Sequence, residues 1–215
     1  MKIISRTSRG TALGSGVVIG RGYHVITNAH VIDGAVGNIE VSIHPEGGPS
    51  VATNGQVVFR SENIDLALIK LANNLIEPID VSRSLPALGD TLILGGFPGI
   101  GGETLTATRG TVAGFDRDGA VIKFDGQIGR GSSGGAAVNE DGKLVAIATA
   151  FSGEPSGGNL GLLLSLPLVA HTLARALLED SRAEGEVVDS QYSLGVIGIP
   201  VVATIPQGWR LVVNF

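Results

Sequence analysis

The chain has 215 residues, of which 43% are hydrophobic and 33 are glycine, and its formal net charge is −5. This composition excludes wholesale disorder, and so much glycine disfavours a bundle of helices because glycine weakens helix interiors. The sequence contains no cysteine, which excludes disulfides, thiolate metal sites and a cysteine nucleophile. The acidic balance argues against nucleic acid as a partner.

Short β-branched segments bounded by Gly, Asn or Pro dominate the chain up to residue 166. They follow one another at about 8 to 15 residues, and no helical pattern separates them. This spacing predicts all-β barrels or a sandwich and disfavours a parallel α/β sheet. The predicted strands are 11–19, 23–27, 38–44, 55–60, 65–71, 91–97, 105–115, 119–124, 135–139, 143–151 and 160–166.

One helix is predicted after these strands, over residues 167–180. Apolar side chains recur along it at helical spacing, so we expect the helix to pack one face on the barrel surface. This apolar stripe consists of Val169, Leu173, Ala176 and Leu177. Residues 187–215 are apolar again, and they either add strands or begin a further module.

No segment of the sequence is recognisable as a membrane span or a signal peptide. The apolar runs are shorter than the roughly 18 residues of a membrane-spanning helix. Residues 1–6 lack the apolar core and the cleavage site of a signal peptide. The sequence therefore leaves the compartment open: extracytoplasmic if the chain is a domain excised from a longer protein, and otherwise cytoplasmic.

Three local motifs carry side chains that are suited to catalysis. His30 follows a predicted strand in TNAHV, Asp65 opens an apolar strand, and Ser133 lies in the glycine-rich turn GRGSSGG. Each motif alone has an ordinary structural explanation, as a buried histidine, a turn aspartate or a flexible hairpin. Their joint occurrence in one glycine-rich, all-β chain favours a catalytic set.

These motifs resemble those of the trypsin-like serine peptidases, and most closely the bacterial HtrA-type branch. The resemblance covers about residues 11–180 and implies an all-β, chymotrypsin-like fold. It implies two six-stranded antiparallel β-barrels with a C-terminal helix, and an active site in the cleft between the barrels. The matching stretches are GSGVVIG (14–20), VITNAHVI (25–32), NIDLALIKL (63–71), GRGSSGGAAVNEDGKLVAIATA (129–150) and GGNLGLLLSLP (157–167).

The resemblance and a composition break at 78–90 together divide the chain into parts. The expected parts are an N-terminal segment (1–10), a first barrel (11–84), a second barrel (85–166), a helix (167–182) and a tail (183–215). The PDZ modules usual in the HtrA-type branch are not recognisable. That branch often trimerises through its N-terminal segment, and only about ten residues precede the first predicted strand, so we expect a monomer.

By resemblance, Ser133 is the nucleophile, His30 its general base and Asp65 the acid that orients the histidine. A serine hydroxyl is a weak nucleophile until a base takes its proton, and histidine exchanges protons near neutral pH. The carboxylate fixes the tautomer of the imidazole and stabilises its charged form. The backbone N–H groups of Gly131 and Ser133 match the oxyanion hole of the family. If Asp65 does not serve, Asp33 is the next candidate acid.

The resemblance also implies the substrate-binding residues. Thr149 supports the catalytic acid, and Thr149, Ala150 and Phe151 form the strand edge that pairs with an extended peptide. Gln127 stands where an acid would select Arg or Lys, so we expect cleavage after small or medium apolar residues. The walls of the specificity pocket are Gln127, Ile128, the strand 149–151, Leu162 and Leu164.

The predicted function is peptide-bond hydrolysis through an acyl-enzyme at Ser133, on protein or peptide substrates, with no metal or organic cofactor. One alternative is an α/β hydrolase, because residues 131–135 also match G-x-S-x-G. That fold requires a helix after the serine, whereas 135–151 is predicted as strands. The other alternative is a peptidase-fold module that binds or senses peptides without cleaving them. It stays open because Gly129 and Arg130 make the turn before Ser133 unusual, and such a turn can hold an inactive oxyanion hole.

Overall fold

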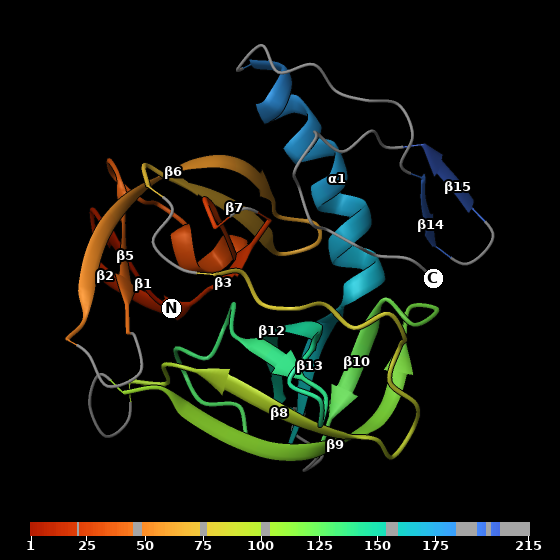
Figure 1. The fold of residues 1–215 in the computed structure, drawn as a ribbon. Coiled ribbons are helices and arrows are strands. Elements are labelled where there is room, and N and C mark those ends of the chain that lie inside the picture. Colours follow the sequence, from red (N-terminus) through yellow and green to blue (C-terminus); the bar gives the residue numbers. More distant parts are fainter. Residues whose placement is uncertain are drawn as a thin grey trace.

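The computed structural model describes residues 1–20, 22–44, 49–73, 77–99, 104–153, 159–183, 193–196 and 199–202. Two β-structures, one from each half of the chain, lie against each other, and a single long helix packs beside them (Figure 1). The predicted all-β fold with a C-terminal helix is therefore confirmed. The division into domains by residue number stays a prediction.

The first half forms one sheet of seven antiparallel strands in the order β2-β1-β5-β6-β7-β4-β3. Its strands are β1 (Lys2–Thr7), β2 (Gly10–Ser15), β3 (Val17–Ile19), β4 (His24–Thr27), β5 (Ile39–Ile43), β6 (Val51–Ser61) and β7 (Leu66–Leu71). β2 and β3 stand at opposite edges of this order, yet only Gly16 separates them along the chain. The two edges must therefore come together at Gly16, and the sheet curls around its own core.

This half differs from the expected six-stranded barrel in its count of strands. The predicted strand 11–19 is divided at Gly16, where a Cβ atom would lie 2.6 Å from Val25 Cγ1. The segment before it is also a strand, because β1 pairs with both β2 and β5. The sequence analysis left β1 outside the barrel.

The second half forms a closed barrel of six strands in the order β10-β13-β12-β11-β8-β9, as predicted. Its strands are β8 (Thr91–Gly96), β9 (Thr106–Asp116), β10 (Val121–Phe124), β11 (Ala136–Val138), β12 (Leu144–Gly153) and β13 (Asn159–Ser165). β11 pairs with β12 only as far as Ile147, whereas β12 continues to Gly153 beside β13. The edge of β12 beyond Ile147 is therefore not paired by β11.

Three clusters of buried apolar side chains hold these parts together. One fills the first sheet, one fills the second barrel, and the third lies between the two halves and the helix α1 (Leu166–Ala183). Val169, Leu173 and Ala176 of the predicted stripe belong to the third cluster, while the side chain of Leu177 lies outside the described residues. Each large apolar side chain buried in this way contributes about 1.5–3 kcal/mol. Among the described residues, no helix has the length and apolar character that crossing a membrane requires.

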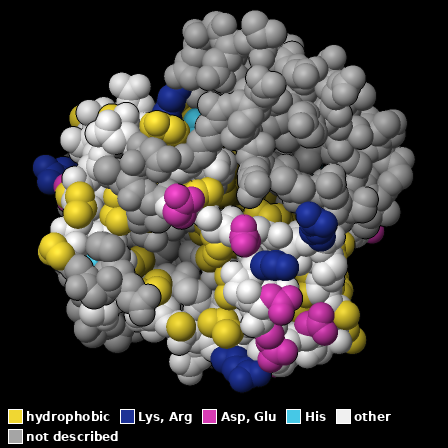
Figure 2. Space-filling model, viewed as in Figure 1, with side chains coloured by type: hydrophobic (Ala, Val, Ile, Leu, Met, Phe, Trp, Pro, Cys, Tyr) yellow, Lys and Arg dark blue, Asp and Glu magenta, His cyan; other side chains and the backbone are white. Residues whose placement is uncertain are grey.

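The connection between the halves is fixed to the second barrel by main-chain hydrogen bonds. Ser82 N–H donates to the Leu144 carbonyl at 2.9 Å, and Leu144 N–H donates to the Asp80 carbonyl at 2.8 Å. Further along, β14 (Ser193–Val196) and β15 (Ile199–Val202) pair with each other, and the rest of 187–215 lies outside the described residues. Figure 2 shows Asp and Glu side chains close to Lys and Arg side chains on the face in view, over the second barrel.

Candidate active site

His30 and Asp65 come together at one end of two neighbouring strands. β4 ends at Thr27 and β7 begins at Leu66, and these strands pair antiparallel, so the residues just beyond them share an edge. His30 lies in the short 3₁₀ helix η1 (Ala29–Ile32) that follows β4. Its Nδ1 is 2.8 Å from Asp65 Oδ2, and its backbone N–H donates to Asp65 Oδ1 at 3.0 Å. The carboxylate therefore fixes both the ring and the backbone of His30.

Asp65 is held in this place by its own backbone as well. Its φ of 59° lies in the left-handed region, which is uncommon for residues other than glycine. Asn28, which is fully buried, donates from Nδ2 to the Asp65 carbonyl at 2.8 Å. The sequence analysis gave Asn28 no role, although a polar residue between a buried strand and the histidine was a signal that could have indicated one.

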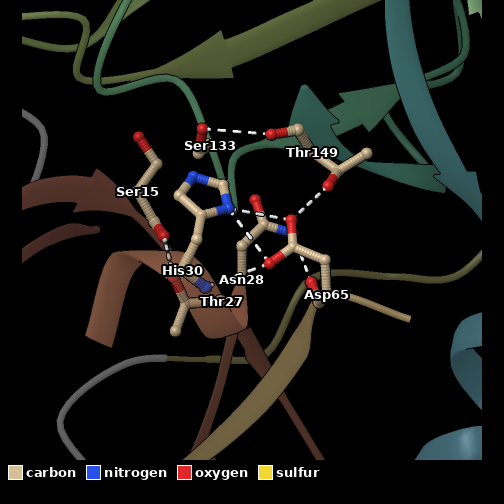
Figure 3. Close-up of polar contacts among 7 residues, drawn as sticks. All are labelled: Ser15, Thr27, Asn28, His30, Asp65, Ser133 and Thr149. Atoms are coloured by element: carbon tan, nitrogen blue, oxygen red, sulfur yellow. Dashed lines mark hydrogen bonds and ion pairs between the residues drawn. The ribbon is translucent and has the colours of Figure 1, made fainter. Parts of the chain in front are cut away.

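Thr149, on β12 of the second barrel, reaches across to the same carboxylate. Its Oγ1 donates to Asp65 Oδ2 at 2.5 Å (Figure 3). Desolvation alone would raise the pKa of Asp65, but the hydrogen bonds from His30 and Thr149 outweigh it and hold the pKa below its ordinary value. Asp65 is therefore ionised at neutral pH, as an acid that orients an imidazole must be.

Ser133 lies on the far side of the imidazole from Asp65. Figure 3 shows the second ring nitrogen of His30 on the side where Ser133 lies, while Nδ1 faces the carboxylate. In the resting structure the Ser133 hydroxyl donates to the Thr149 carbonyl at 3.2 Å. Among the residues drawn in Figure 3, no hydrogen bond joins Ser133 to His30. The three predicted catalytic residues thus share one site, with the hydroxyl engaged elsewhere than at the ring.

The turn before Ser133 has a definite type. The Ser132 N–H donates to the Gly129 carbonyl at 3.1 Å, which closes a four-residue turn with Gly131 in its third position. Gly131 has a φ of 94°, and a positive φ at this position marks a type II turn, whereas a type I turn has a negative φ there. The two types differ in the direction of the peptide between the second and third residues. The turn type therefore determines the side to which the Gly131 N–H points.

Within residues 131–135, two N–H groups have no acceptor in the described part of the chain. The N–H groups of Ser132, Gly134 and Gly135 all donate to backbone carbonyls, but those of Gly131 and Ser133 do not. These are the two donors that the sequence analysis assigned to an oxyanion hole. Free donors beside a nucleophilic hydroxyl are what such a hole requires.

The glycines of the turn are also required by packing. A Cβ atom on Gly131 would lie 2.5 Å from the Phe97 carbonyl oxygen, and one on Gly134 would collide with the Ser15 carbonyl. Ser132, whose side chain could compete with that of Ser133, is buried. Its Cβ would be 3.4 Å from a Cβ on Gly96. The turn therefore packs closely against β8 on one side and against the end of β2 on the other.

A family model of the trypsin-like peptidase domain matches residues 14–147, which span this site from β2 to β12. The chain belongs to the trypsin-like peptidases. Their HtrA-type branch, indicated by the sequence motifs, is also where its relatives lie. A probable periplasmic serine endoprotease, DegP-like, of Buchnera aphidicola is 31% identical over 99% of this chain and 45% of its own length. The chain thus spans less than half the length of that curated relative.

Two solved protease structures share the fold of this chain and also resemble its sequence. The serine endoprotease from Yersinia pestis has a TM-score of 0.68 and 25% identity, covering 95% of this chain and 70% of that one. The HtrA-type protease AlgW, solved with a tripeptide, has a TM-score of 0.66 and 25% identity, covering 87% of this chain and 61% of that one.

The residues expected to form the specificity pocket of this trypsin-like peptidase are not all brought together. Gln127 is exposed, and its carbonyl accepts a hydrogen bond from Thr108 at 2.9 Å. Ile128 is half-buried against the core of the second barrel and fills the space beside Gly161, where a Cβ would collide with it. Leu164 instead lies in the cluster between the two halves and α1, with 4% of its surface exposed.

The remaining predicted pocket residues lie on strands β12 and β13. Ala150 pairs with Leu162, which is half-buried, and Phe151 pairs with Gly161. The side chains of Ala150 and Phe151 lie outside the described part of the structure. Gly161 had no role in the sequence analysis, although a glycine inside an apolar strand is a known sign of close approach by another group.

Asp33, the alternative acid, points elsewhere. Its carboxylate accepts a hydrogen bond from Arg60 at 2.7 Å, and 71% of its side chain is exposed. Asp65 is therefore the acid that the structure pairs with the histidine. Across the described residues, no group of three or more His, Asp or Glu side chains is placed to hold a metal ion.

Proposed function

We propose that this chain is a serine endopeptidase domain that cleaves peptide bonds through an acyl-enzyme on Ser133. The observation that carries the proposal is the meeting of His30, its paired Asp65 and Ser133, which come from two separate β-structures. The two N–H donors of the turn support the same chemistry. The relatives described above are serine endoproteases, which agrees with it.

Acylation follows from these positions. The Ser133 Oγ attacks the carbonyl carbon of the scissile bond while its proton passes to the ring nitrogen of His30 that faces away from Asp65. The carbonyl oxygen gains a negative charge, and the N–H groups of Gly131 and Ser133 stabilise it. The C–N bond then breaks, and the amine leaves with the proton from His30. The ionised Asp65 stabilises the imidazolium in between.

Deacylation repeats these steps with water as the nucleophile. His30 takes a proton from the water as its oxygen attacks the ester carbonyl, and the same two N–H groups stabilise the second tetrahedral intermediate. The ester bond breaks, Ser133 recovers its proton from His30, and the peptide leaves as a carboxylic acid.

The Thr149 carbonyl has a part in starting this cycle. It accepts the Ser133 hydroxyl in the resting structure, and it lies on the stretch of β12 that β11 leaves unpaired. An extended peptide that adds to this edge would offer its own N–H to the Thr149 carbonyl. Substrate binding then releases the hydroxyl of Ser133 to turn toward His30, which joins binding to activation.

Small or medium apolar residues are the proposed preference at the cleavage site. Ile128 packs against the core of the second barrel and against Gly161, so it gives the proposed pocket an apolar wall and takes up space there. No carboxylate is among the residues assigned to the pocket, and a buried acid is what selects Arg or Lys. Because the proposed reaction is hydrolysis of peptide bonds, the proposed substrates are proteins or peptides. An extracytoplasmic location is proposed from the periplasmic relatives.

The test is to profile the purified chain against a proteome-derived peptide library, with Ser133→Ala as the control. We expect cleavage after Ala, Val, Leu or Ile, and none in the control. A strong preference for Arg or Lys would contradict the proposed pocket while leaving the catalytic proposal intact. Cleavage that persists in Ser133→Ala would contradict the catalytic proposal itself.

A non-catalytic peptide-binding module is the second candidate, and the hydrogen bond from Ser133 to Thr149 favours it, because it holds the hydroxyl away from the base. Such a module binds the same peptides without cleaving them. Binding of library peptides by wild type, with no cleavage at any temperature at which the chain is folded, would establish it in place of the peptidase.

A further inference from the structure

Ser15, the last residue of β2, lies at the contact between the two halves of the molecule and is 1% exposed. Its hydroxyl donates to the Gly131 carbonyl at 2.7 Å and accepts the Phe97 N–H at 2.8 Å. Its backbone N–H donates to the Ser133 carbonyl at 2.7 Å, and its carbonyl accepts the Thr27 hydroxyl at 2.7 Å. One residue of the first half thus binds three segments around the active site.

The hydroxyl of Ser15 performs a task that few side chains can. A hydroxyl donates one hydrogen bond and accepts others, so it can pair a carbonyl with an N–H from a different segment. Here the N–H belongs to Phe97, which is buried after β8, and the carbonyl belongs to Gly131 in the turn before the nucleophile. Without the hydroxyl, two main-chain groups in a closely packed region would lose their partner, which is costly.

These bonds act on the two residues whose N–H groups face the oxyanion. The peptide that contains the Gly131 carbonyl is held at both ends, since its N–H, on Ser132, donates to the Gly129 carbonyl. The Ser133 carbonyl is held by the Ser15 N–H. The carbonyls of both donor residues are therefore bonded to β2. The Gly131 N–H lies in the preceding peptide, whose direction the type II turn sets, and the bond from Ser15 to the Gly131 carbonyl helps to hold the chain in that turn.

We propose that Ser15 is a positioning residue that keeps the Gly131 N–H directed at the oxyanion through its hydroxyl. This inference rests on the proposed peptidase function. Ser15 has no hydrogen bond to His30 or Asp65, so it acts on the stabilisation of the oxyanion and not on proton transfer. The sequence analysis gave Ser15 no role of its own, because residues 14–16 were only part of a stretch that resembles the family.

Ser15→Ala tests this role, because it removes the hydroxyl and keeps the backbone bonds to Ser133 and Thr27. Loss of an oxyanion donor costs about 10²–10³ in kcat, and a donor that is merely misdirected costs less, so we expect a fall in kcat of about 10- to 100-fold. KM and the pH midpoints of kcat/KM should stay unchanged. The affinity of a peptide aldehyde, whose adduct with Ser133 carries an oxyanion, should fall by the same factor as kcat.

Ser5→Ala is the matched control. Ser5 is also a fully buried serine of the first sheet, but its hydroxyl has no hydrogen-bond partner among the residues that the structure describes. The kcat of Ser5→Ala and its affinity for the peptide aldehyde should stay within about twofold of wild type. If Ser15→Ala unfolds at the assay temperature, Ser15→Cys replaces it, because the thiol is similar in size and a weaker donor. The folded Ser15→Cys variant is then expected to lose kcat as well, but by a smaller factor than Ser15→Ala.

Three outcomes overturn the inference. They are Ser15 variants with the kinetics of Ser5→Ala, variants that raise KM at constant kcat, and variants that lower kcat but bind the aldehyde as wild type does. In each case wild type is still active, so the proposed function stands. If wild type itself neither cleaves peptides nor forms the aldehyde adduct, the proposed function fails instead, and Ser15 has no oxyanion to serve.

Discussion

The two sides of the active site are assembled by different means. On the acid–base side, an ionised carboxylate accepts hydrogen bonds from the His30 ring, the His30 backbone and Thr149. On the nucleophile side, the groups that matter are uncharged backbone N–H groups, placed by a type II turn and by the hydroxyl of Ser15. Each half of the fold supplies a residue that forms hydrogen bonds across the contact, Thr149 to the acid and Ser15 to the turn.

This difference teaches how each side should fail. Charge holds the acid–base side, so its function depends on pH and on the partners of one carboxylate. Backbone geometry and close packing position the groups on the nucleophile side. The contribution of this side to kcat should therefore depend little on pH, but strongly on a single added or removed atom. Variants of the two sides should therefore separate by their pH profiles as well as by their rates.

The largest expected effect is that of Ser133→Ala, on the nucleophile side. Loss of the nucleophile lowers kcat by about 10⁶-fold, because the remaining groups cannot form the acyl-enzyme. Peptide binding, measured by fluorescence anisotropy of a labelled peptide, should be retained. Substantial turnover by the variant would point to another nucleophile, and Ser132→Ala in the same assays identifies whether its neighbour serves.

Asp65→Asn should have the next largest effect, now on the acid–base side. The amide cannot hold the required tautomer of His30 or stabilise its charged form, so kcat should fall by about 10⁴-fold with a modest change in KM. Asp33→Asn is the matched control and should stay within about twofold of wild type, since its exposed pair with Arg60 contributes little. A near-normal rate for Asp65→Asn would show that the acid lies elsewhere.

Gly131→Ala should lower kcat by about 10²–10³-fold through the turn alone. The added Cβ meets the Phe97 carbonyl at 2.5 Å, and the φ of 94° is strained for any side chain. Gly119→Ala is the control, because its φ of 85° carries the same strain but its Cβ meets nothing within 4 Å. The control should cost about 1–2 kcal/mol in the free energy of unfolding and leave kcat unchanged. Equal kinetics for both variants would contradict the role of the turn.

The smallest effect is predicted for Thr149→Val, which removes a hydrogen bond to Asp65. That bond stabilises the ionised form, so its loss should raise the pKa of Asp65 toward its ordinary value. Asp65 stays ionised at neutral pH, but a carboxylate that has lost one of its donors positions His30 less well, so kcat/KM should fall by about tenfold there. The stabilisation from Asp65 is present above the ordinary pKa of about 3.9 and is lost as the pH falls through the lowered pKa. In the variant the loss of stability on acidification should therefore be smaller and complete at a higher pH, and identical curves would contradict the account.

Local motifs were sufficient to predict the three residues that meet at the candidate site. His30, Asp65 and Ser133 each lie at the end of a strand or in a turn with a recognisable pattern, and their order is specific. Local patterns could not predict which distant residue supports each one. Nothing in GSG indicates that Ser15 will meet the Gly131 carbonyl, because that contact depends on how two separate halves pack.

The strands show a similar limit. Residues 160–166 are apolar on both faces, so no alternation distinguishes the side of Leu164 from that of Leu163. The structure places Leu163 inside the second barrel and Leu164 against the first half and α1. β1 was missed because its alternation, KIISRT, is short and partly polar, and its place in the sheet depends on pairing with β5.

The most direct measurement is intact-mass analysis after reaction with a fluorophosphonate probe, which labels an activated serine. The account predicts one adduct on wild type, located at Ser133 by peptide mapping, and none on Ser133→Ala or His30→Ala. Failure of wild type to react, or an adduct on Ser132 that persists in Ser133→Ala, would contradict the claim that His30 and Asp65 activate Ser133.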